Sequence, residues 1–144
     1  MTDNQIRDAI FSIFKKDGVT AIDNSPYSTT SAYIDIYGED ILSLWFEPNY
    51  QNPEYLSFFT AFDFIDPEEY EKHEQEWRTE LKENKSFFSE IERTVDGLVL
   101  LRGQIAKEHL TTKWFESMKQ FLHERTPLIN ELLAKEKQFE LDQE

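Results

Sequence analysis

The sequence predicts a single α+β domain, residues 1–144, in which an antiparallel sheet packs against helices. A chain of 144 residues is the length of one domain. Its 39% hydrophobic and 15% aromatic residues are enough to bury a core. Segments with helical periodicity are separated by segments of strict alternation, in the order helix, β-meander, helix, β-hairpin, long C-terminal helix.

The first helix is expected to begin near Thr2. Thr2 and Gln5 have the spacing of a capping box, in which each residue's side chain bonds the other's backbone N–H. Ile6 and Ile10 recur at helical spacing, and Gly18 supplies a stop signal.

A meander of antiparallel strands should follow. Residues 19–22 can form a short strand, residues 31–37 and 41–47 alternate around a turn at 38–40, and residues 55–64 alternate again. Alternation places successive side chains on opposite faces of the sheet.

The second helix should begin at Asp66 and Pro67, a capping residue followed by a proline at the first helical position. Its apolar stripe is thin, with Tyr70, Trp77 and Leu81 separated by charged and amide side chains. We therefore expect only one edge of this helix to be buried.

Residues 87–95 and 98–106 are predicted to form a hairpin. Asp96 and Gly97 between them favour a type I′ turn, in which both central residues have positive φ.

The last helix should begin after Thr111 or Thr112 and is expected to kink or restart at Pro127. Its apolar residues recur at helical spacing on both sides of the proline.

This order of elements resembles the YbjN-like family, whose members share the fold of type III secretion chaperones. The resemblance lies in residues 6–18, the strand ending at Phe64 with Asp66-Pro67-Glu68-Glu69 after it, the hairpin around Asp96-Gly97 with Arg102 on its outgoing strand, and the helix from Thr112 through Pro127. It implies a non-enzymatic role in polypeptide binding or regulation, often as an acidic dimer.

The residues offer little catalytic chemistry. With no cysteine there is no thiolate nucleophile or zinc thiolate. His73 begins a zincin-like pattern, but Trp77 stands where the second histidine is needed. We expect no enzyme activity, no cofactor and no metal. Carboxylate pairs such as Glu39 with Asp40 leave an enzyme as the third hypothesis.

The net charge of -14 argues against direct binding to nucleic acid or an anionic membrane. No stretch is apolar over the roughly 20 residues needed to cross a bilayer, and the polar N-terminus does not resemble a signal peptide. A cytoplasmic location is expected. The acids of residues 68–83 support an alternative function: an acidic inhibitor or immunity-type protein that binds a basic nucleic-acid-binding target.

The alternating strands carry the main functional hypothesis. One face should form the core, with Ala32, Ile34, Ile36, Leu42, Leu44, Phe46, Leu56, Phe58, Phe62, Phe64, Val99, Leu101 and Ile105. The opposite face is unusually apolar, which indicates a contact surface unless Tyr70 and Trp77 of the second helix cover it. The sequence therefore predicts an adaptor or chaperone-like protein that binds a polypeptide, or its own copy, through Tyr33, Tyr37, Trp45, Tyr55, Phe59, Leu98 and Leu100.

Overall fold

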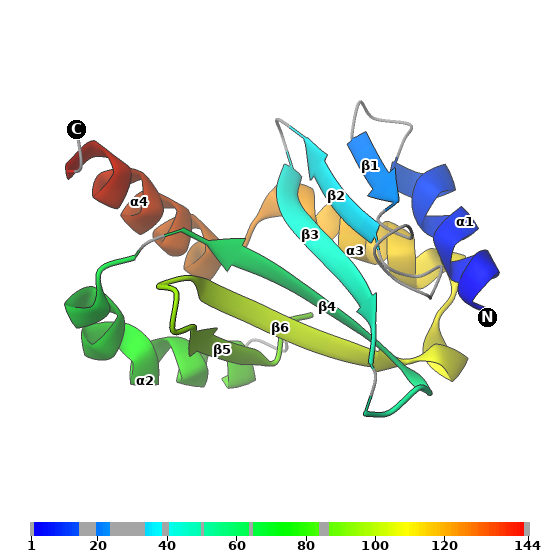
Figure 1. Ribbon diagram of the computed structural model, residues 1–144, viewed down its shortest axis with the longest axis horizontal. Helices are drawn as coiled ribbons and strands as arrows, with labels where there is room; N and C mark the ends of the chain where they lie inside the picture. Colours follow the sequence, from blue (N-terminus) through cyan, green and yellow to red (C-terminus); the bar gives the residue numbers. More distant parts are fainter. Residues whose placement is uncertain are drawn as a thin grey trace. The chain divides into compact units, whose positions relative to one another are not determined.

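The computed structural model describes residues 2–14, 20–23, 34–38, 41–49, 51–63, 65–83 and 87–142. Its elements, in chain order, are α1 (Asp3–Phe14), β1 (Thr20–Asp23), β2 (Ile34–Gly38), β3 (Ile41–Pro48), β4 (Tyr55–Phe62), α2 (Pro67–Glu83), β5 (Glu90–Arg93), β6 (Val99–Ala106), the 3₁₀ turn η3 (Lys107–His109), α3 (Thr112–Glu124) and α4 (Pro127–Asp142) (Figure 1). This confirms the α+β class and the expected order of helices and strands.

The strands follow one another in the order β1-β2-β3-β4-β6-β5. The pairs β1 with β2, β2 with β3, β3 with β4 and β5 with β6 are antiparallel. The chain divides into two compact units, Met1–Phe59 with Gln104–Glu124, and Thr60–Gly103 with Arg125–Glu144. Strands β4 and β6 contribute residues to both units, and the single domain stays a prediction.

The first unit is built on the N-terminal helix and α3. The capping box at the start of α1 is confirmed, because the Thr2 N–H donates to Gln5 Oε1 at 2.9 Å and the Gln5 N–H donates to Thr2 Oγ1 at 3.2 Å. The Phe46 ring packs edge-on against Phe115 of α3, with ring centroids 6.1 Å apart. Both phenylalanines are fully buried, so α3 covers the core face of β3.

Strand β4 shows the alternation that the sequence predicts. Every second side chain is buried, and the side chains between them are half-buried. The buried set is Leu56, Phe58, Thr60 and Phe62, and the half-buried set is Tyr55, Ser57, Phe59 and Ala61. Of the predicted core side chains that are described, Ile105 is half-buried and the others are buried. Those of Ala32, Ile34, Ile36 and Phe64 lie outside the described residues.

The second unit contains α2 and α4. The thin stripe of α2 is confirmed, since its buried residues are Tyr70, Trp77 and Leu81. Trp77 is fully buried, and its indole Nε1–H donates to Glu131 Oε2 of α4 at 3.1 Å. This hydrogen bond satisfies the one polar group that burial of the indole would otherwise leave unpaired.

The turn between β5 and β6 differs from the predicted type I′ turn. Gly97 has a φ of 92°, whereas Asp96 does not have positive φ. The Thr94 N–H donates to the Leu98 carbonyl at 2.8 Å, and the Gly97 N–H donates to the Thr94 carbonyl at 3.0 Å. Val95 thus lengthens the loop to three residues, with glycine in the left-handed position, and the type I′ prediction is wrong.

The C-terminal helix restarts at Pro127, as one of the two sequence alternatives predicts. The residue after the end of α3, Arg125, has a φ of 56° and breaks the helical path. The Thr126 hydroxyl oxygen then caps α4 by accepting the Ile129 N–H at 3.3 Å. At the start of α3 the capping residue is Thr111, whose Oγ1 accepts the Trp114 N–H at 3.1 Å.

Replacing Asp96 and Gly97 one at a time tests this turn geometry. Gly97→Ala should lower the free energy of unfolding by about 1–2 kcal/mol, because a Cβ is unfavourable in the left-handed region. Asp96→Ala should change it by less than about 0.5 kcal/mol. Urea unfolding followed by circular dichroism measures both values. Equal losses in the two variants would contradict the three-residue loop, because a type I′ turn strains alanine at both positions.

Candidate functional site

The face of β3 and β4 opposite the core of the first unit is the strongest candidate site. We call it the outer face and define it as Ser43, Trp45, Glu47, Tyr55, Ser57 and Phe59. All six side chains are half-buried. In Figure 1, α3 crosses behind β2 and β3, on the side to which Phe46 points. The side chains of the outer face therefore point away from the helix that covers the core.

Trp45 and Phe59 form the centre of the outer face. They are direct partners in the register of β3 with β4, and the neighbouring pair is Glu47 with Ser57. Their rings are stacked with centroids 5.3 Å apart and planes 13° apart. A cross-strand aromatic pair of this kind restricts the orientation of both rings.

The other predicted contact residues do not all lie on the outer face. Tyr55 lies on the outer face and also lines a cavity of about 440 Å³ with Pro53, Glu54, Ala106, Lys107 and Glu108. The backbone of Tyr37 is paired with Thr20 of β1. Tyr33 lies outside the described residues.

Leu98 and Leu100 belong to the second unit. Leu98 is half-buried, but Leu100 is only 6% exposed and therefore offers little surface to a partner. Val99 and Leu101 beside it are also buried, so the start of β6 does not alternate. A strand segment buried on both faces cannot be assigned from a period of two, which is why the sequence placed Leu100 on a contact surface.

Tyr70 and Trp77, the residues that could have covered an apolar sheet face, have contacts of their own within the second unit. Their rings lie 6.0 Å apart, and the Trp77 ring stacks on the His73 imidazole at 5.3 Å. The Trp77 indole also donates a hydrogen bond to Glu131.

The acids of α2 and α4 lie in contrasting environments. Lys135 bonds Glu69 at 3.0 Å and holds the pKa of that carboxyl below its usual value. Burial raises the pKa of Glu80, and the neighbouring Glu131 and Glu76 raise it further. The acidic helix is thus not a uniform negative surface.

Glu136 of α4 has a half-buried carboxyl that accepts a backbone hydrogen bond. Burial raises its pKa, the hydrogen bond that it accepts from the Asp63 N–H lowers it, and the carboxylates of Glu140 and Asp63 raise it again. The net direction is upward, so the folded protein favours the protonated form of Glu136.

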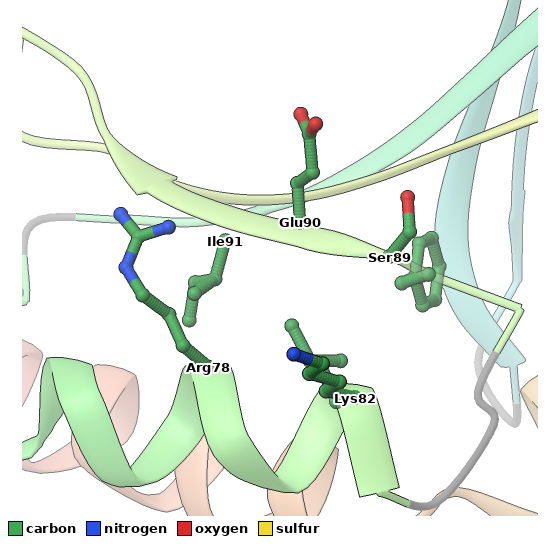
Figure 2. Close-up of a pocket in the computed structure, with 7 residues that line it drawn as sticks. Arg78, Lys82, Ser89, Glu90 and Ile91 are labelled. Atoms are coloured by element: carbon green, nitrogen blue, oxygen red, sulfur yellow. The ribbon is translucent and has the colours of Figure 1, made fainter.

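A groove between α2 and β5 is a further surface, and the sequence did not indicate it. Its volume is about 380 Å³, and Figure 2 shows its lining: Arg78, Leu81, Lys82, Phe88, Ser89, Glu90 and Ile91. The only sequence signal was the spacing of Arg78 and Lys82, which places both cations on one face of the helix.

Within the described part of the chain, no three histidine or acidic side chains gather where they could hold a metal ion. None of the helices described here is long and apolar enough to cross a membrane.

The sequence matches no protein-family model, and no curated protein is significantly similar to it. The resemblance to the YbjN-like family therefore stays a prediction.

The environment of Glu136 predicts a dependence of stability on pH. Its folded pKa is raised above the ordinary value of 4.5, so its favourable contribution is present at low pH and is lost as the pH rises through the folded pKa. Glu136→Gln keeps a hydrogen-bond acceptor for Asp63 and removes the charge. The variant should exceed the wild type in free energy of unfolding at pH 7 and match it below about pH 4.

Urea unfolding between pH 3.5 and 7.5 measures this difference. Glu71→Gln is the matched control, because Glu71 is exposed on α2 and loses the same charge. The raised pKa of Glu136 would be refuted if Glu136→Gln increased the free energy of unfolding by the same amount at every pH, or if the control variant showed an equal increase.

Proposed function

We propose that this chain is a cytoplasmic, non-enzymatic adaptor or chaperone-like regulatory protein that binds a polypeptide through the outer face. The observation that carries the proposal is the stacked pair of Trp45 and Phe59, half-buried on the side of the sheet opposite its core. The partner is a protein or peptide, and a second copy of the chain is the homodimeric form of the same proposal.

The composition of the outer face supports this function. Tryptophan and other aromatic residues contribute much of the binding energy of protein interfaces, because they bury large areas and lose few rotamers. Ser43 and Ser57 lie on the same face as the aromatic pair, and their hydroxyl groups can hydrogen-bond a partner's polar groups. A rigid aromatic centre with a polar margin is the usual anatomy of an interface.

The charge of the chain narrows the class of partner. A net charge of -14 repels phosphate backbones and anionic lipid surfaces, so nucleic acid and membranes are not part of the proposal. The resemblance to the YbjN-like family agrees with polypeptide binding.

The second candidate is the acidic inhibitor that binds a basic target through α2. The exposed acids Glu68, Glu71 and Glu83 favour it. Two other acids of the helix are already paired, Glu74 with Arg78 at 2.7 Å and Glu69 with Lys135 at 3.0 Å. This internal pairing lowers the charge that the helix can offer to a basic target, so we rank this function second.

Removing the aromatic pair tests the proposed function. The double variant Trp45→Ala, Phe59→Ala should keep the helical circular dichroism signal and weaken capture of the partner at least about 30-fold, since hot-spot residues each contribute about 2 kcal/mol or more. Tagged protein is incubated with native lysate at low and high salt, and the bound proteins are identified by mass. The control is Val95→Ala, Leu141→Ala, which removes exposed apolar side chains that belong to the second unit.

A partner that stays bound to the wild type at high salt, and that only the double variant fails to capture, supports the adaptor function. A basic partner that is lost at high salt from every variant alike would move the function to the acidic helix. If the double variant unfolds, the aromatic pair belongs to the core and the site assignment is wrong.

A further inference from the structure

Two acidic side chains lie close together where α2 meets α4. Glu131 of α4 is held against α2, because its Oε2 accepts the Trp77 Nε1–H at 3.1 Å. Glu80 follows Trp77 by three residues, so both lie on the same side of α2. Glu80 and Glu131 are both half-buried, and both belong to the second unit. One buried indole therefore brings the two acids to the same contact between helices.

The surroundings of Glu80 disfavour its charge. Burial raises the pKa of the Glu80 carboxyl, and the carboxylates of Glu131 and Glu76 raise it further. Glu76 precedes Glu80 by four residues, so these two acids are neighbours on the surface of α2. Like charges on two packed helices repel each other more strongly when they are partly withdrawn from water. The contact between α2 and α4 therefore contains a repulsive pair at neutral pH.

The cations of α2 and α4 on the neighbouring turns have other contacts. Lys135, one turn after Glu131 on α4, bonds Glu69 at 3.0 Å. Arg78 and Lys82 of α2 line the groove beside β5, and Figure 2 shows both side chains on that side of the helix. None of these three cations is among the groups that shift the pKa of the Glu80 carboxyl.

Strand β5 also lies beside α2, and its charged residues leave the pair unneutralised. Figure 2 shows Glu90 pointing away from the helix. Glu92 is bonded by Arg102 at 2.6 Å. Arg93 is half-buried, and its charge is not among those that shift the pKa of Glu80. The charge of Glu80 is thus opposed by other acids without a compensating cation from α2, α4 or β5.

We propose that Glu80 and Glu131 share one proton, taken up from solvent when the pH falls, and that this shared proton ties α2 to α4. The protonated Glu80 carboxyl donates to the Glu131 carboxylate. That carboxylate has two acceptor oxygens, so it keeps its hydrogen bond from Trp77 as well. A hydrogen bond to an ionised acceptor is stronger than one between neutral groups. This pH-sensitive latch belongs to the second unit and does not depend on the polypeptide-binding function.

The latch closes in one direction of pH. The pKa of Glu80 is raised in the folded protein, so its favourable contribution is present at low pH and is lost as the pH rises through the folded pKa. Lys135 lowers the pKa of Glu69, so this second link between α2 and α4 stays ionised while Glu80 takes up its proton. Mild acidification therefore adds one link between the helices and keeps the other.

Hydrogen exchange of the Trp77 indole N–H, measured by NMR in deuterated buffer, reports how often α2 separates from α4. This N–H is buried and bonded across the two helices, so its exchange requires the contact to open. In the wild type its protection factor should rise about fivefold between about pH 7.5 and 4.5, the effect of one added hydrogen bond. A protection factor that stays constant or falls on acidification would overturn the proposal.

Two variants of similar length separate proton sharing from simple loss of charge. Glu80→Gln carries an amide donor for Glu131 at every pH, whereas Glu80→Met removes the charge and has no donor. At about pH 7.5 the Gln variant should protect the Trp77 indole about fivefold more than the Met variant. Equal protection in the two variants would mean that relief of repulsion alone matters, and the shared proton would be ruled out.

Titration of ¹³C-labelled glutamate carboxyls identifies the partner of Glu80. Glu131→Gln keeps an acceptor for the Trp77 indole and removes the neighbouring charge, so the titration midpoint of Glu80 should fall. Glu71→Gln is the control, because Glu71 is exposed on α2, and it should leave the midpoint unchanged. Circular dichroism verifies that both variants are folded. An unchanged midpoint in Glu131→Gln, or an equal fall in the control, would show that Glu131 is not the partner and the proposal is wrong.

Discussion

The constraint on which the first unit depends is the period of two along β3 and β4. Leu44, Phe46 and Phe58 must enter the core beneath α3, and this forces Trp45 and Phe59 onto the opposite side of the sheet. A register slip of one residue would expose the first set and bury the second. The free energy of core burial therefore also determines where the aromatic pair lies, although the pair itself is not part of the core.

In the second unit, a highly charged helix packs through a small number of side chains. α2 buries only Tyr70, Trp77 and Leu81, and the Trp77 indole is both fully buried and hydrogen-bonded to Glu131. Because so little of the helix is committed to the core, most of its charged side chains remain at the surface. Arg78 and Lys82 of this helix are exposed and line a groove beside β5.

The packing of the helices, as well as the composition of the chain, determines the environment of each charged side chain. Burial and like-charged neighbours raise the pKa of Glu80 and Glu136, whereas Lys135 lowers that of Glu69. A chain of net charge -14 thus has an aromatic outer face in one unit and a groove with two cations in the other.

The sequence by itself determined the features that depend on near neighbours in the chain: the capping box of Thr2 and Gln5, the break in the helix at Pro127, and the placement of Trp45 and Phe59 on one face of the sheet. Caps, proline geometry and alternation act over a few residues, so a single sequence reveals them. Only the tertiary structure decided that Leu100 is buried, that Val95 lengthens the turn before Gly97, and that Arg78 and Lys82 meet β5 at a groove. Those outcomes depend on which segments pack against each other through space, and neither local propensity nor periodicity contains that information.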